Sequence, residues 1–264
     1  PDGAIYCVDN GDSTIRKFDI GGNLLSIIGT PHKPSPKMSG EPFNKPAHLA
    51  VDKRTGHLYI ADGYSNARVH KYTPDGKHIL SWGESGNGEG QFNIVHNIAV
   101  GEEGWVYVAD RENHRIQVFD PHGIFLRKWG ISGSGDGEFS QPQGLAIDND
   151  GNVYVSEYGN DRLQVFDPQG RFLRKWGSEG SGNGQFRTPQ GLAIDSEGDV
   201  YVSDRDNNRI QVFDPQGRFL RKWGSEGSGD GEFSQPQDLA IDGDGNVYVS
   251  DQGNHRILVF KPTV

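Results

Sequence analysis

A nineteen-residue stretch that occurs twice, letter for letter, constrains the fold of this chain more than any other feature. "QVFDPQGRFLRKWGSEGSG" occupies residues 164–182 and returns at 211–229. A second stretch, "GSGDGEFSQPQ", occupies 133–143 and returns at 227–237. The offsets are 47 and 94 residues, one period and two. A fixed period of this length indicates a repeat architecture, in which each repeat is one supersecondary unit.

One period contains four short segments with the character of β-strands. In one copy they lie at 191–195, 200–204, 209–214 and 218–224 and are rich in Val, Ile, Tyr and Phe with alternating polarity. Turn residues separate them, as in "DPQG" at 214–217, where Pro presets φ and Gly allows the chain to leave the turn. Helical periodicity is not apparent, so the sequence predicts an all-β chain.

Six copies of a four-stranded antiparallel unit are typical of a six-bladed β-propeller, here a single domain over 1–264. The second and third strands occur six times, but the first and fourth occur five times. We therefore expect the first blade to lack its channel-side strand and the last blade its fourth strand. The third strand of the last blade, 257–260, should then be an unprotected edge. The predicted blades are about 1–29, 46–83, 95–130, 142–177, 189–224 and 236–264.

An acidic residue ends the second strand of every copy, and an arginine follows it within five to seven residues. Because a carboxylate and a guanidinium can form two parallel hydrogen bonds, we predict repeated structural clamps rather than six active sites. The predicted pairs are Asp9–Arg16, Asp62–Arg68, Asp110–Arg115, Glu157–Arg162, Asp204–Arg209 and Asp251–Arg256.

Composition limits the classes of partner. The formal net charge of −10 opposes non-specific attraction to nucleic acid or to an anionic membrane. The basic "LRK" triplets of the fourth strands suit edge protection, so nucleic acid is not an expected partner. Apolar runs stay well short of the ~20 residues that a membrane span needs. A single cysteine, Cys7, excludes an internal disulfide and leaves the compartment open. A monomer is expected.

Two family resemblances add to this interpretation. The unit "PQGLAIDNDGNVYVSEYGNDRLQVFDPQGRFLRKWG" at 142–177 resembles the NHL repeat, and the resemblance extends over essentially the whole chain. It implies a propeller and, by itself, no activity. The stretches 43–100 and 106–119 resemble peptidyl-α-hydroxyglycine α-amidating lyase, a zinc propeller, through "DGYSNAR", "WGESGNGEGQF", "VHNIA" and "VADREN".

The lyase resemblance implies three site residues: His96 as a zinc ligand, Tyr64 as the active-site tyrosine and Arg111 as an active-site arginine. A cation near a tyrosine lowers its pKa, so that it can serve as a general base. An arginine can orient a carboxylate. An arginine, Arg205, also stands two repeats after Arg111, so a structural role common to the repeats is an alternative for Arg111.

The chain departs from the lyase pattern where the family places its other zinc-binding histidines. The equivalent position of the fifth blade holds Gln190, and amides are poor zinc ligands. We therefore predict a non-catalytic binding or structural propeller that requires no cofactor, with a lyase-like first half and very regular, recently amplified or engineered last blades. The alternative is a zinc-dependent amidating-lyase-like enzyme.

The channel of the predicted propeller offers further candidate positions. Asp238, with channel carbonyls, could hold a hard cation such as calcium. A peptide or small polar ligand is expected at the channel mouth, where such ligands usually bind. The predicted ligand face consists of His48, Asn97, Gln143, Gln190 and Gln237.

Overall fold

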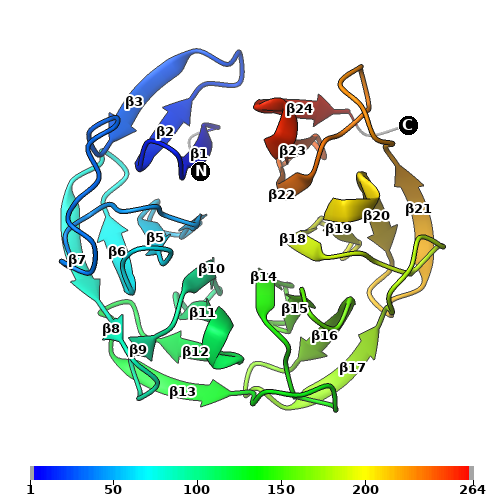
Figure 1. Cartoon of the computed structure of the whole chain (residues 1–264), viewed down its shortest axis with the longest axis horizontal. Helices are drawn as coiled ribbons and strands as arrows, with labels where there is room; N and C mark the ends of the chain where they lie inside the picture. Colours follow the sequence, from blue (N-terminus) through cyan, green and yellow to red (C-terminus); the bar gives the residue numbers. More distant parts are fainter. Residues whose placement is uncertain (1–2, 262–264) are drawn as a thin grey trace. The chain divides into compact units, whose positions relative to one another are not determined.

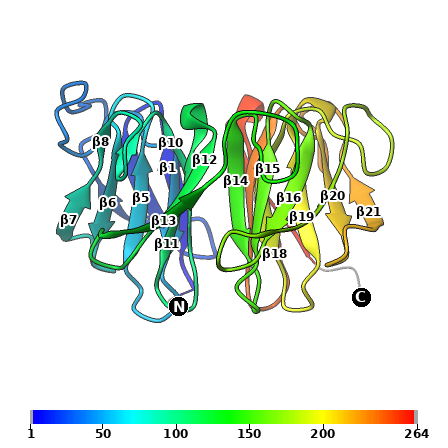
Figure 2. The same ribbon diagram turned by 90° about the horizontal axis from the view of Figure 1, so that it is seen from below.

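The computed structural model describes residues 3–261 and contains six antiparallel sheets in chain order (Figures 1 and 2). The chain divides into two compact units, Pro1–Ile131 and Ser132–Val264, each with three sheets. The predicted fold class, an all-β six-bladed β-propeller with a first and a last blade one strand short, is confirmed. A single domain over 1–264 stays a prediction, and the blade limits at 1–2 and 262–264 lie outside the described residues.

Unit 1 holds blades 1 to 3. Blade 1 has the order β1-β2-β3, blade 2 β4-β5-β6-β7 and blade 3 β10-β11-β12-β13; a short parallel pair, β8-β9, joins the last two. A 3-10 helix, η1, follows β11. The elements are β1 (Ile5–Asp9), β2 (Thr14–Phe18), β3 (Leu24–Ile28), β4 (His48–Val51), β5 (Leu58–Asp62), β6 (Arg68–Tyr72), β7 (His78–Trp82), β8 (Glu84–Ser85), β9 (Gln91–Phe92), β10 (Val95–Val100), β11 (Val106–Asp110), η1 (Arg111–Asn113), β12 (Arg115–Phe119) and β13 (Phe125–Trp129).

Unit 2 holds blades 4 to 6, with the orders β14-β15-β16-β17, β18-β19-β20-β21 and β22-β23-β24. Two further 3-10 helices follow β19 and β23, and residues 3–261 contain no α-helix. The elements are β14 (Pro142–Ile147), β15 (Val153–Glu157), β16 (Arg162–Phe166), β17 (Phe172–Trp176), β18 (Pro189–Ile194), β19 (Val200–Asp204), η2 (Arg205–Asn207), β20 (Arg209–Phe213), β21 (Phe219–Trp223), β22 (Pro236–Ile241), β23 (Val247–Asp251), η3 (Gln252–Asn254) and β24 (Arg256–Phe260).

The core of each unit lies between the faces of successive blades. Alternation along the second and third strands places Val, Ile and Tyr side chains on both faces, where they pack against the neighbouring blade. The aromatic contact between Trp82 and Phe119, at a centroid distance of 5.7 Å, returns in unit 2 as Trp176 and Phe213 at 5.8 Å. Each buried Phe stabilises the fold by about 2 to 3 kcal/mol. The repeat therefore reproduces its core as well as its strands.

The "DPQG" turn shows why the repeat keeps its glycine. Gly217 has φ +82°, a conformation that residues with a Cβ atom rarely adopt. A Cβ there would also lie 2.7 Å from Cδ2 of Trp176, which packs over the turn from the preceding blade. One residue thus serves both the hairpin and the packing between blades.

The predicted clamps form in blades 3 to 6, with arginine Nε donating to the carboxylate at 2.5 to 2.9 Å. The geometry differs from the expected pair of parallel hydrogen bonds between guanidinium and carboxylate. In blade 3, the terminal nitrogens of Arg115 donate instead to the carbonyls of Asn87, Gly88 and Gln91. Each clamp therefore fastens the glycine-rich loop that precedes its blade.

The clamp prediction was wrong for blade 2 and is altered in blade 1. Asp62 accepts from His70 Nε2 at 3.1 Å and from Asn66 Nδ2 at 2.7 Å, in place of Arg68. The loop before blade 2 is the proline-containing 30–44 segment, which does not have the glycine-rich sequence of the loops whose carbonyls receive the guanidinium in blades 3 to 6. In blade 1, Arg16 bonds to Asp12 and lies 3.6 Å from Asp9.

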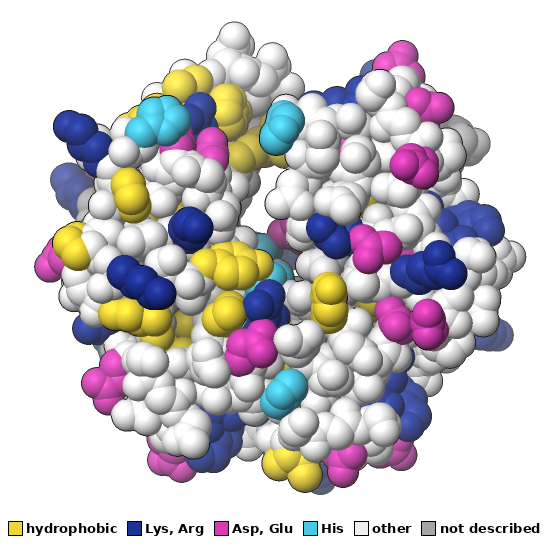
Figure 3. Space-filling model, viewed as in Figure 1, with side chains coloured by type: hydrophobic (Ala, Val, Ile, Leu, Met, Phe, Trp, Pro, Cys, Tyr) yellow, Lys and Arg dark blue, Asp and Glu magenta, His cyan; other side chains and the backbone are white. Residues whose placement is uncertain are grey.

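The surface agrees with the mixed charge of the sequence. On the face shown in Figure 3, basic and acidic side chains are interspersed rather than gathered by sign. Within residues 3–261, the structure holds no helix with the length and apolar character needed to cross a bilayer. The expectations about nucleic acid, membrane and monomeric state stay predictions.

Candidate functional site

Unit 1 brings together the three residues that the lyase resemblance implies. Tyr64 follows β5, His96 lies in β10 and Arg111 opens η1. Tyr64 Oη is 3.0 Å from His96 Nε2, and the two rings meet edge to face with centroids 5.8 Å apart. The guanidinium carbon of Arg111 lies 5.5 Å from the centroid of the Tyr64 ring. We call these three side chains the Tyr64 cluster.

Backbone features hold the cluster in place. A Cβ atom at Gly63 would lie 2.0 Å from the carbonyl oxygen of Val95, so only glycine lets the turn before Tyr64 lie directly against β10. His96 is the extra residue of a β-bulge, because the pairing of β10 with β11 shifts between Val95 and Asn97. Bulges of this kind redirect a side chain and are frequent next to functional sites.

The cluster offers a polar, accessible surface. Tyr64 is 39% exposed, and the side chain of Arg111 is 18% exposed. Nε of Arg111 donates to Oε1 of Glu112 at 2.8 Å, which fixes the plane of the guanidinium. The contact between Arg111 and Tyr64 adds about 0.5 to 1 kcal/mol. A phenol, an imidazole and a guanidinium, each able to form hydrogen bonds, therefore stand side by side.

The donors near His96 do not fit a zinc ion. Catalytic zinc usually takes three protein ligands. In the described part of the chain, no group of three or more His, Cys, Asp or Glu side chains could hold a metal. The blade 4 and blade 5 positions equivalent to His96 are Gln143 and Gln190, which are 3% and 6% exposed. We therefore derive no reaction step through a metal. Calcium at Asp238 stays a prediction; its Oδ1 accepts from the N–H of Leu239 at 2.9 Å.

The predicted ligand face is more buried than the sequence suggested. Asn97, Gln143 and Gln190 are at most 6% exposed, because first-strand side chains are covered by adjacent blades. His48 is half-buried, and its Nδ1 accepts from the N–H of Ile98 at 3.4 Å. Gln237 donates to Gln252 at 2.7 Å. Ligand binding by these five residues stays a prediction.

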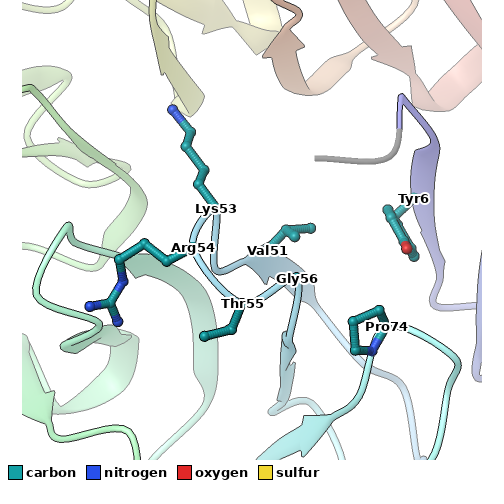
Figure 4. Close-up of a pocket in the computed structure, with 7 residues that line it drawn as sticks. All are labelled: Tyr6, Val51, Lys53, Arg54, Thr55, Gly56 and Pro74. Carbon is teal, nitrogen blue, oxygen red and sulfur yellow. The ribbon is translucent and has the colours of Figure 1, made fainter.

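Sequence reasoning missed a pocket of about 260 Å³ in unit 1 (Figure 4). It lies at the β4–β5 turn, at the end of β5 remote from Tyr64, and Tyr6 faces the turn across it. The sequence does set this turn apart from its counterparts. It reads "DKRTG" at 52–56, with two basic residues, where blades 4 to 6 have "DNDGN", "DSEGD" and "DGDGN". The lining residues are Tyr6, Val51, Lys53, Arg54, Thr55, Gly56 and Pro74.

Family models match several segments of the chain. A model described as "NHL repeat" matches residues 43–72, 92–119 and 139–166. A model described as "6-bladed beta-propeller" matches residues 196–263. Between them, these matches reach into both units.

Known proteins resemble parts of the chain. Human NHL repeat-containing protein 3 is 37% identical over 102 residues, which cover 38% of this chain and 29% of that protein. Peptidyl-glycine alpha-amidating monooxygenase A of Xenopus laevis is 34% identical over 118 residues, which cover 42% of this chain and 12% of that protein. The matched segments thus span less than a third of either relative.

Solved structures resemble the whole chain at low identity. A protein of unknown function from Bacteroides thetaiotaomicron superposes with a TM-score of 0.73 at 19% identity, over 97% of this chain and 66% of that one. At such identity the likeness shows the fold alone.

Proposed function

We propose that this chain, which contains NHL repeats in a six-bladed β-propeller and is homologous to peptidyl-glycine α-amidating enzymes, binds a peptide rather than transforming one. The observation that supports this is the Tyr64 cluster, where three polar side chains from two blades converge on one accessible surface. The ligand class is a short peptide with a free carboxylate.

Arg111 would receive the carboxylate. Its bond to Glu112 uses one of the five N–H donors of the guanidinium, and the terminal nitrogens suit a carboxylate bonded through both oxygens. Its stacking on Tyr64 means that little side-chain entropy is lost on binding. Tyr64 and His96, already hydrogen-bonded to each other, can donate to or accept from the peptide backbone.

We propose binding without catalysis because of the side chains available to bind a metal. Gln143 and Gln190 are buried amides where histidines would be needed, and they offer poor ligands for zinc. The cluster keeps residues suited to recognition without a set of side chains that would hold a catalytic metal.

The second candidate is a zinc-dependent amidating lyase. It is favoured by the convergence of Tyr64, His96 and Arg111 and by relatives named as amidating enzymes. The two functions differ in turnover, so one experiment separates them.

The experiment measures binding and turnover of a peptidyl-α-hydroxyglycine with and without added zinc. We expect binding by calorimetry and no release of peptide amide. Arg111→Gln should weaken binding at least tenfold, because a hydrogen bond to a charged group is worth about 1.5 to 3 kcal/mol. The matched control is Arg205→Gln, the equivalent arginine of blade 5, which should bind as the wild type does. Zinc-dependent turnover by the wild type would overturn the proposal, as would unchanged binding by Arg111→Gln.

A further inference from the structure

A chain of hydrogen-bonded side chains runs through blade 2 and ends at a serine on its outermost strand, β7 (Figure 1). Oγ of Ser81 lies 2.6 Å from Nδ1 of His70, and Nε2 of His70 lies 3.1 Å from Oδ2 of Asp62. His70 and Asp62 are fully buried, whereas Ser81 is half-buried. A hydroxyl, an imidazole and a carboxylate are therefore linked in the order of a nucleophile, its base and a group that orients the base.

The surrounding donors hold the carboxylate in place. The N–H of Asn44 donates to both oxygens of Asp62, at 3.0 and 3.2 Å, and Nδ2 of Asn66 donates to Oδ2 at 2.7 Å. The ring of Phe43 meets that of His70 edge to face, with centroids 5.5 Å apart. The proline-containing 30–44 segment thus covers the buried end of this chain of hydrogen bonds.

These partners determine where the protons lie. An ionised Asp62 only accepts, so Nε2 of His70 carries the ring proton and Nδ1 accepts from the hydroxyl of Ser81. Nε2 of His78 lies 2.7 Å from the same Oγ and can donate to it. Burial and the neighbouring His70 lower the pKa of His78, which favours its neutral ring. The proton of Ser81 is therefore directed at the nitrogen that can remove it.

The residues around this hydroxyl are departures from the repeat. Blades 3 to 5 hold glutamine, lysine and phenylalanine where blade 2 has His70, Ser81 and His78. In those blades the glutamine donates to the clamp acid, as Gln117 does to Asp110 at 3.1 Å. Three separate replacements thus meet around one hydroxyl, which the packing of the repeat does not require.

We propose that Ser81 is a nucleophile that takes the acyl group of a short-chain carboxylic ester, with His70 as its general base and Asp62 as the residue that orients His70. The acyl chain is short because the hydroxyl is half-buried beside the ring of His78. The site is distinct from the Tyr64 cluster, since Ser81 lies on the outermost strand of blade 2 and His96 on the first strand of blade 3.

The reaction needs only the ester and water. Oγ of Ser81 attacks the carbonyl carbon while its proton passes to Nδ1 of His70. The tetrahedral intermediate then expels the alcohol, which leaves with that proton, and the acyl group stays on Ser81. Water attacks the acyl-serine in the same way, with His70 moving its proton to Oγ, so that the carboxylic acid leaves and the hydroxyl is restored.

The test uses the full chain with two probes. The first is a fluorophosphonate, from which Oγ displaces fluoride to form a phosphonyl ester that resists water, so the label accumulates whatever the rate of deacylation. We expect the label on Ser81, located by tandem mass spectrometry of the tryptic peptide 78–111. The second is p-nitrophenyl acetate, whose cleavage should be at least tenfold faster with the wild type than with Ser81→Ala.

Two variants test the roles of the buried partners. His70→Gln installs the residue of blades 3 to 5, which keeps a hydrogen bond to the acid, and should slow ester cleavage about a hundredfold or more. Asp62→Asn should slow cleavage at least tenfold in the wild type but have no further effect in His70→Gln, because it acts through His70. Equal slowing in both backgrounds would overturn the role given to Asp62.

Two matched controls separate this hydroxyl from any exposed serine. Ser85→Ala removes an exposed serine of the same tryptic peptide and should leave labelling and cleavage unchanged. Lys128→Ser places a serine at the equivalent position of blade 3, opposite Gln117 instead of a histidine, and this serine should not be labelled. An unlabelled Ser81 would overturn the proposal. Labelling of Ser81 that His70→Gln leaves undiminished, or that the new serine of Lys128→Ser matches, would do the same.

Discussion

Replacing Arg209 by methionine should destabilise the protein far more than a surface arginine would. The guanidinium donates to Asp204 at 2.6 Å and to three carbonyls of the preceding loop, those of Ser181, Gly182 and Gln185. The side chains of Arg209 and Asp204 are 8% and 0% exposed. Methionine fills much of the same volume but leaves the carboxylate without its positive partner.

The size of the expected loss of stability follows from the carboxylate of Asp204, which would stay buried without its positive partner. Removing one partner of a buried ion pair typically costs about 3 to 5 kcal/mol, because the remaining charge stays desolvated. Burial already raises the pKa of the Asp204 carboxyl with Arg209 in place, so the carboxylate depends on that partner. We expect a loss of about 3 to 5 kcal/mol in the free energy of unfolding.

Two comparisons make the test specific. Arg256→Met removes the same clamp in blade 6, where the arginine is 27% exposed and water can partly replace it, so the loss should be about half as large. The double variant Asp204→Asn with Arg209→Met should be more stable than Arg209→Met alone, because no buried charge remains.

Urea unfolding followed by tryptophan fluorescence measures all of these variants, and hydrogen exchange of residues 178–187 reports on the fastened loop. The reasoning would be refuted if Arg209→Met lost less than about 1 kcal/mol, the range of an exposed ion pair. It would also be refuted if the double variant lost the sum of the two single changes.

Two further predictions concern the Tyr64 cluster and pH. Gly63→Ala should weaken carboxylate-peptide binding and lower the melting temperature, because the new Cβ would lie 2.0 Å from the Val95 carbonyl; Gly243→Ala, with nothing within 4 Å, is the control. Burial raises the pKa of Asp110 and of Asp204, so the folded state holds their protons more tightly than the unfolded state does. The stability from this source is present below the unfolded pKa and is lost as pH rises through the raised values. The stability of Asp204→Asn relative to wild type, from urea unfolding at pH 3.5 and 7, should therefore increase with pH.

The sequence predicted most of the fold because the repeat carries its own local rules. Alternating Val, Ile and Tyr residues define the strands, and "DPQG" defines the hairpins, so the strand count of every blade could be predicted. The exception at Asp62 had a long-range cause. In blade 3 the clamp arginine binds carbonyls of a glycine-rich loop 27 residues earlier in the chain. Before blade 2 the 30–44 segment takes the place of that loop.

The candidate site was less predictable, since its geometry depends on contacts between blades. Tyr64 and His96 are 32 residues apart, and they meet because of a glycine that allows backbone contact and a bulge that turns a histidine. Neither feature has a signature in strand periodicity. The burial of Gln143 and Gln190 likewise reflects covering by neighbouring elements rather than anything in their own segments.

The repeat also supplies an internal reference that separates structural contacts from specific ones. Arg111 and Arg205 occupy the same place in blades 3 and 5, and each bonds to the acid that follows it, Glu112 at 2.8 Å and Asp206 at 2.8 Å. That contact therefore belongs to the repeat. The second partner differs, because Arg111 stacks on Tyr64 while Arg205 donates to Gln235 at 2.9 Å. Unit 2 also carries an exposed tyrosine, Tyr158, in the turn after β15, but the second partner of Arg205 is Gln235. A ligand that unit 1 binds and unit 2 does not should therefore depend on the stacking of Arg111 on Tyr64.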